Sequence, residues 1–130
     1  MIVDSSVVVS VILGELDSVK FSKALDAADA LSMSAGTFLE LSIVIDRRKN
    51  PAYSNRIEEL IERFNIIIEP VTAEQTRIAR QAYRDYGKGS GHRANLNFGG
   101  CFSYALARVK REPLLFKGDD FVYTDVRSAV

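Results

Sequence analysis

The chain has 130 residues, 47% of them hydrophobic, and its 17 basic and 17 acidic side chains cancel. This length is enough for one compact domain with a buried core and leaves no room for a second, so we expect a single domain over residues 1–130. The balanced charge excludes attraction to nucleic acid or membrane by an overall field, so a charged site must come from local segregation.

The cysteine content and the hydropathy pattern narrow the class of protein further. The single cysteine, Cys101, excludes an internal disulfide and a cysteine-rich metal centre. Residues 1–13 are apolar, but they lack a basic leader and are interrupted by Asp4, which is poor for a signal peptide. No run approaches the roughly 20 apolar residues of a membrane span. We therefore expect a soluble, cytoplasmic protein with no membrane partner.

In the first half of the chain, short apolar runs alternate with helical stripes. Ile2 and Val3 form an apolar run that ends at Asp4, and residues 17–29 carry apolar side chains at helical spacing. Pro51 is expected to end one helix before the next begins. The predicted elements are a strand at 2–3, helices at 6–13 and 17–29, a strand at 30–34, and helices at 36–49 and 52–64.

The second half of the chain continues the alternation. Thr72 followed three residues later by Gln75 is a capping-box pattern and predicts a helix start. The predicted elements are a strand at 65–71, a helix at 72–87, a Gly-rich loop at 88–100, a helix at 101–111 and a strand at 113–116. This order favours an α/β domain with a mainly parallel central sheet, helices on both faces, and a functional site at the carboxyl ends of the strands.

The stretch "LNFGGCFSYALA", residues 96–107, has an unusual helix start. A helix start favours Ser, Thr, Asp or Asn at the cap and acids in the first turn, yet Gly99 and Gly100 stand there. We assign Gly99 to the preceding loop and interpret Gly100 as a position from which a side chain is missing.

Four acidic residues follow predicted strands or lie in the helix after one: Asp4, Glu40, Asp119 and Asp120. In a parallel sheet these positions converge on one edge, where carboxylates repel each other unless a cation joins them. Mg²⁺ or Mn²⁺ suits such oxygen ligands. The alternatives are an N-cap for Asp4, a solvated helix position for Glu40 and a turn for the other two. Asp4 is the hardest to dismiss, because a charge between two apolar runs needs a partner.

Basic residues form a second pattern, on the helix at 72–87 and in the loop after it. They could hold an RNA backbone, or they could be an ordinary solvated helix face. These residues are Arg77, Arg80, Arg84, Lys88, His92 and Arg93.

Four motifs, in order, make the whole chain resemble a PIN-domain ribonuclease, and in particular the VapC toxins of bacterial VapBC toxin–antitoxin pairs. They are "MIVDSS", "SAGTFLELSIVI", "YGKGSGHRANLNFGGCFSYALA" and "PLLFKGDDFVYTDV". The resemblance implies a PIN-like fold and an endoribonuclease dependent on Mg²⁺ or Mn²⁺. It also implies a homodimer whose acidic pocket a cognate VapB-type antitoxin masks.

The family's acids can be carried over by position. Asp4 and Glu40 match its first two acids, which the resemblance makes catalytic. Within "KGDD" we choose Asp119 as the catalytic ligand, with Asp120 and Asp125 as further metal-site candidates; the alignment does not separate Asp119 from Asp120.

The chain departs from the family at Gly100. Relatives of this type carry Asp immediately before the cysteine, in "NFGDCFSYALA", whereas this chain has glycine. We interpret Gly100 as a lost metal ligand that impairs catalysis. A change of Asp to Gly needs only one base, so design or selection against toxicity could produce it; a natural inactive homologue is the alternative.

Two rival functions remain. The first is a binding module of the same fold that engages antitoxin or RNA without cleavage. The second is a receiver-type signalling domain, which wants an acidic pair after its first strand where "VDSS" offers one acid.

Overall fold

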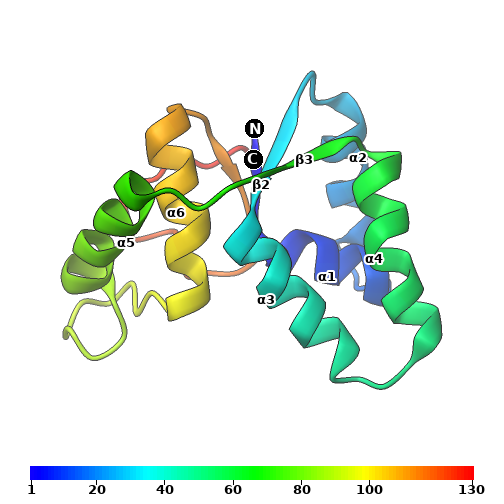
Figure 1. The fold of residues 1–130 in the computed structure, drawn as a ribbon, viewed down its shortest axis with the longest axis horizontal. Helices are drawn as coiled ribbons and strands as arrows, with labels where there is room; N and C mark the ends of the chain where they lie inside the picture. Colours follow the sequence, from blue (N-terminus) through cyan, green and yellow to red (C-terminus); the bar gives the residue numbers. More distant parts are fainter.

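The computed structural model describes residues 1–130 as an α/β domain built on a four-stranded parallel sheet (Figure 1). The strand order is β3-β2-β1-β4, which places β1 in the interior. The strands are β1 (Ile2–Val3), β2 (Leu31–Ser34), β3 (Ile66–Glu69) and β4 (Leu114–Leu115). The predicted parallel sheet is confirmed; β1 has its predicted bounds, and the other three strands are shorter than the apolar runs indicated.

Helices cover both faces of the sheet, as predicted. In Figure 1, α5 and α6 lie on one side of the strands, and α1 to α4 lie on the other. The helices are α1 (Ser5–Leu13), α2 (Ser18–Ala27), α3 (Ala35–Asp46), α4 (Pro51–Arg63), α5 (Ala73–Tyr86) and α6 (Phe98–Lys110). None of them combines the length and the apolar character needed to cross a membrane.

The neighbouring strands β1 and β4 contribute to two separate hydrophobic cores. Ile2 and Leu114 belong to the core beside α5 and α6, whereas Val3 and Leu115 belong to the core beside α1 to α4. This division follows from the pleat, which points successive side chains to opposite faces. All four side chains are fully buried. Both strands are therefore continuously apolar in sequence, as is typical of parallel strands that are buried on both faces.

Pro51 begins a helix, which corrects the prediction that it ends one. α3 already ends at Asp46, and Pro51 occupies the first position of α4. Proline suits that position because its fixed φ matches the helix and its missing N–H has no acceptor there. The Asn50 side chain accepts a hydrogen bond from the Ala52 N–H at 3.0 Å and caps the helix.

The helix α6 begins at Phe98, so Gly99 and Gly100 lie in its first turn rather than in the loop. The cap is Asn97, whose Oδ1 accepts a hydrogen bond from the Gly100 N–H at 2.7 Å. Both glycines are buried. The assignment of Gly99 to the loop is therefore wrong: Asn97, a residue type that favours the cap position, starts the helix before Gly99.

The connections define a switch point at the carboxyl edge of the sheet. The chain runs from β1 to β2 and on to β3 through α1 to α4 over one face. It then returns from β3 to β4 through α5 and α6 over the other face. The neighbouring strands β1 and β4 are therefore connected over opposite faces, and such a switch point is where open α/β sheets bind ligands.

We predict that Asn97→Ala destabilises the protein by about 1 kcal/mol, because the first turn of α6 loses its side-chain acceptor. Urea unfolding followed by circular dichroism measures the change. Asn97→Ser keeps a capping oxygen and should cost less. Equal losses for the two variants would contradict the assigned cap.

Candidate functional site

Asp4 occupies the carboxyl end of β1 as a buried, fully hydrogen-bonded carboxylate. Its residue is only 6% exposed. Oδ2 accepts hydrogen bonds from the Ser6 N–H at 3.1 Å and the Ser6 hydroxyl at 2.7 Å. Oδ1 accepts one from the Ser103 hydroxyl at 2.6 Å. Asp4 is thus the N-cap of α1, as its alternative interpretation proposed, and it also faces α6.

Hydroxyl groups extend the Asp4 contacts across the domain. The Thr37 hydroxyl lies 3.0 Å from that of Ser103, which connects α3 to α6. The Lys117 N–H donates to the Ser6 hydroxyl at 3.0 Å, which ties the segment after β4 to α1. Thr37 and Ser103 are completely buried. The carboxylate of Asp4 therefore sits in a network that joins four elements at the switch point.

Glu40 lies on α3 and turns its carboxylate toward the same edge of the sheet. Its Oε1 accepts a hydrogen bond from the Ser5 hydroxyl at 2.8 Å. Burial raises the pKa of Glu40; the Ser5 hydrogen bond opposes this rise, and the charges of Asp4 and Asp120 add to it. Glu40 is therefore no freely solvated helix residue.

Asp120 belongs to this acidic group. Partial burial raises its pKa, and the charges of Asp4 and Asp119 raise it further. Asp120, and not Asp119, acts on the pKa of Glu40. The segment that carries both aspartates is anchored by the Lys117 ammonium.

The Lys117 anchor consists of two ion pairs with the turn between α1 and α2. The distances are 3.2 Å to Glu15 and 3.1 Å to Asp17. Together with the Lys117 N–H bond to Ser6, they fix the start of the acid-bearing segment by side chain and by backbone.

The donor set of this edge fits a hard divalent cation. Asp4, Glu40 and Asp120 interact electrostatically with one another, and the neighbouring groups are serine hydroxyls. Carboxylate and hydroxyl oxygens are the ligands that Mg²⁺ and Mn²⁺ take. No three Asp, Glu, His or Cys side chains stand close enough to hold an ion as they are.

Gly99 and Gly100 point in different directions from the first turn of α6. A Cβ on Gly99 would overlap the carboxylate of Glu40. A Cβ on Gly100 would lie 2.8 Å from Cδ1 of Leu96, 3.2 Å from Oδ1 of Asn97 and 3.4 Å from Cζ of Phe121. A side chain at position 100 thus needs a small shift of Leu96 and points toward the residue that follows Asp120.

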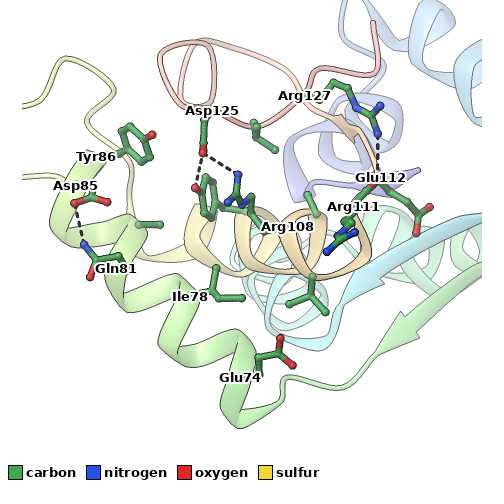
Figure 2. A pocket seen from close by; sticks show the side chains of 15 residues that line it. Glu74, Ile78, Gln81, Asp85, Tyr86, Arg108, Arg111, Glu112, Asp125 and Arg127 are labelled. Carbon is green, nitrogen blue, oxygen red and sulfur yellow. Dashed lines mark hydrogen bonds and ion pairs between the residues drawn. The ribbon is translucent and has the colours of Figure 1, made fainter.

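Asp125, a predicted further metal-site residue, is engaged elsewhere. Its carboxylate accepts hydrogen bonds from the Tyr104 hydroxyl at 2.6 Å and from Arg108 at 2.8 Å. These contacts line a pocket of about 830 Å³ between α5, α6 and the C-terminal segment (Figure 2). The structure does not bring Asp125 together with Asp4, Glu40 and Asp120.

The predicted basic residues are all exposed, on α5 and in the loop that follows it. None forms an ion pair. Arg93 contacts the segment that follows the acids in the chain, since its guanidinium lies 4.2 Å from the ring centre of Tyr123. Nδ1 of His92 accepts the Ala94 N–H at 3.0 Å, which makes His92 a loop-shaping residue. These six residues are Arg77, Arg80, Arg84, Lys88, His92 and Arg93.

The sequence analysis did not predict the hydroxyl groups that contact the acids. Ser5 and Ser6 directly follow Asp4, so their proximity could have been inferred from the N-cap pattern. Ser103 and Thr37 gave no such signal, because α6 brings Ser103 to Asp4 and α3 brings Thr37 to Ser103 only through tertiary packing.

Fold and site together define a single α/β domain with interacting carboxylates at the carboxyl edge of a parallel sheet. The PIN domain family model matches residues 1–126. VapC ribonuclease Mb0625 of Mycobacterium bovis and ribonuclease VapC28 of Mycobacterium tuberculosis are each 48% identical over 130 residues, covering 100% of this chain and 98% of the relative. The chain therefore belongs to the PIN-domain family, among the members named VapC ribonucleases.

Solved structures agree with this fold. The crystal structure of Mycobacterium tuberculosis VapC20, a Sarcin-Ricin loop cleaving toxin, superposes with a TM-score of 0.74 at 16% identity, covering 96% of this chain and 95% of that one. A toxin–antitoxin complex from Klebsiella pneumoniae gives 0.71 at 14% identity, with 95% and 92% covered. At these identities the likeness concerns the fold, and it confirms the predicted PIN-like architecture.

The raised pKa of Glu40 predicts a pH-dependent stability. The folded protein keeps the Glu40 proton to a higher pH than the unfolded chain, in which glutamate has a pKa of about 4.3. Ionisation of Glu40 therefore lowers the free energy of unfolding as the pH rises. Glu40→Gln should therefore be more stable than the parent at pH 7, and this advantage should shrink toward pH 4. Urea unfolding in EDTA at both pH values measures it.

The matched control for this prediction is Glu58→Gln, an exposed position on α4. It should show no such pH-dependent advantage. A Glu40→Gln advantage that is equal at both pH values would contradict the assigned cause.

Proposed function

We propose that this chain is the toxin of a toxin–antitoxin pair, an endoribonuclease that uses Mg²⁺ or Mn²⁺ at Asp4, Glu40 and Asp120. The observation that carries the proposal is geometric: a buried Asp4 and the carboxylate of Glu40 lie at the carboxyl edge of the sheet, each held by a serine hydroxyl of α1. The raised pKa values of Glu40 and Asp120 agree with this placement, since perturbed acids gathered at one sheet edge are typical of a functional site. The relatives named VapC ribonucleases support the reaction class.

The chain's own residues would prepare this reaction by holding the acids in place. Ser6 and Ser103 fix both oxygens of Asp4, and Ser5 fixes one oxygen of Glu40. When bound, the cation supplies an activated water for in-line attack on the phosphodiester and neutralises the charge that develops. Catalysis then depends on how many carboxylates this edge offers.

Gly100 leaves the site one carboxylate short, so we propose that the chain cleaves RNA weakly. The binding module that engages its partners without cleavage is the alternative. The weakened ribonuclease and the binding module differ in how they respond to an acid at position 100, because only a metal site that has lost a ligand binds its metal more tightly when that acid is restored.

We predict that Gly100→Asp tightens Mn²⁺ binding by about tenfold or more, since ligands and their close supports are worth at least that much. Metal-dependent cleavage of RNA should rise with it. Isothermal titration with Mn²⁺ and a gel assay with and without EDTA measure the two effects.

Gly100→Asn is the matched control, because it makes the same demand on Leu96 but adds no charge. It should show neither gain. If Gly100→Asp also shows neither, position 100 is not a lost ligand, and an unchanged Mn²⁺ affinity favours the binding module.

A second prediction separates the two neighbouring aspartates in the Gly100→Asp background. Asp120→Asn should weaken Mn²⁺ binding by about tenfold, since Asp120 interacts with Asp4 and Glu40, whereas Asp119→Asn should weaken it less. Both variants keep size and remove one charge. The reverse order would return the ligand role to Asp119, the original choice from the sequence.

The RNA would approach over the side of the acidic edge where the loop after α5 lies. Arg93 is the basic residue that this path uses first, because it stacks on Tyr123 close to Asp120. The exposed arginines of α5 (Arg77, Arg80 and Arg84) and Lys88 would add phosphate contacts farther out.

Two protein partners complete the proposal, a cognate VapB-type antitoxin and a second copy of this chain, all in the cytoplasm. The antitoxin would cover the acidic edge of the sheet. For the homodimer we propose the face formed by Leu39 and Ile43 of α3 and Phe98 of α6, which are exposed large apolar side chains. Phe102 packs on Gly36 beneath this face and holds the two helices together.

A further inference from the structure

Gly99 is a buried residue whose environment differs from that of its neighbour Gly100. The nearest atoms to a Cβ at position 99 all belong to the Glu40 carboxyl group, namely Oε2, Cδ and Oε1. The two carboxylate oxygens and the side chain of position 99 thus compete for one space. No atom of Glu40 is among the three nearest to a Cβ at position 100.

We infer that Gly99 is a positioning residue for Glu40: the missing side chain lets the Glu40 carboxylate lie against the first turn of α6. The importance of this placement for a metal site rests on the proposed function. The placement itself rests on geometry alone.

Two contacts on opposite sides define where the Glu40 carboxylate lies. On one side the Ser5 hydroxyl of α1 donates to Oε1 at 2.8 Å. On the other side stands the backbone of Gly99 in α6. A side chain at position 99 would displace the carboxylate from this place. Only a residue without a Cβ leaves the carboxylate this place.

A second glycine supports the same approach of α3 to α6. A Cβ on Gly36 would overlap the ring of Phe102. Glu40 lies four residues after Gly36 on α3 and so faces the same neighbour, one turn along the helix. α3 thus meets α6 through a glycine of its own at one level and through Gly99 of α6 at the next.

This placement makes the effect of Gly99→Ala depend on Glu40. Alanine favours a helix over glycine, so without a clash the substitution should stabilise α6. With Glu40 in place, the methyl group displaces a carboxylate held by Ser5. The sign of the stability change should therefore differ between the parent and a variant that lacks the Glu40 side chain.

The experiment is a double-mutant cycle of Gly99→Ala with Glu40→Ala in the full chain, in EDTA. We expect Gly99→Ala to lower the melting temperature of the parent by a few degrees and to leave unchanged or raise that of Glu40→Ala. Equal shifts in the two backgrounds overturn the inference. Gly100→Ala is the matched control, and its shift should be the same in both, because its Cβ meets Leu96, Asn97 and Phe121.

Rescue by a shorter acid distinguishes positioning from simple crowding of α6. Glu40→Asp withdraws the carboxylate by one methylene, so Gly99→Ala should cost less in that background than in the parent. If the cost is unchanged, the carboxylate is not what position 99 accommodates.

Mn²⁺ titration separates this inference from the proposed function. In the Gly100→Asp background, Gly99→Ala should weaken Mn²⁺ binding by about tenfold. A thermal cycle that shows coupling while Gly99→Ala leaves this affinity intact overturns the link between Gly99 and the metal. Absence of Mn²⁺ binding by Gly100→Asp itself counts against the proposed function, whereas the thermal cycle is independent of metal.

Discussion

The structure depends on one buried charge, the Asp4 carboxylate at the carboxyl end of β1. Removing a carboxylate from water is costly unless hydrogen bonds replace the lost solvation. Here the donors are the Ser6 N–H, the Ser6 hydroxyl and the Ser103 hydroxyl, which come from two helices on opposite faces of the sheet. The Ser6 hydroxyl also accepts a hydrogen bond from the Lys117 N–H, and the Ser103 hydroxyl also contacts that of Thr37. The hydrogen bonds that satisfy this one charge therefore fix α1, α3, α6 and the segment after β4 relative to one another. The arrangement of the acidic edge therefore follows from the hydrogen bonds that the buried Asp4 carboxylate requires.

Around this charge the protein collects further carboxylates at a cost to its own stability. Glu40 and Asp120 both have raised pKa values, which means that the folded state disfavours their ionised forms. A domain selected for stability alone would not gather acids in this way, and a cation is the simplest means of offsetting their repulsion. If Gly100 is the lost ligand that we propose, the same change that weakens the metal site also removes one charge from this edge and so lowers the repulsion between its acids in the absence of metal.

The sequence predicted the architecture because local signals and global packing agree over most of the chain. Apolar runs at residues 2–3 and 30–34 became buried parallel strands, and Thr72 capped α5 as its pattern indicated. The errors have local causes. Pro51 was treated as a terminator although it fits the first position of a helix, and Asn97 was overlooked as a cap. The site was predictable only in part. Of the four acids that the strand-end rule selected, the structure couples Asp4, Glu40 and Asp120 electrostatically, and the choice of Asp119 as the ligand stays a prediction. The rule could not find Ser103 or Thr37, whose contacts arise only from packing. Nor could it show that Asp125 is engaged by Tyr104 and Arg108.

The two adjacent glycines illustrate what a helix adds to a motif. Consecutive residues on a helix point about 100° apart, so Gly99 and Gly100 face different surroundings although they are neighbours in the chain. Gly99 faces the Glu40 carboxylate and has no room for a side chain, whereas Gly100 faces Leu96, Asn97 and Phe121 and has room for one after a small shift. The sequence alone indicates only that Gly99 and Gly100 together make a weak helix start. Geometry separates them into a glycine that the placement of Glu40 requires and a glycine beside which a side chain fits after a small shift of Leu96, and this difference in direction is why we propose the missing acid at position 100 and not at position 99.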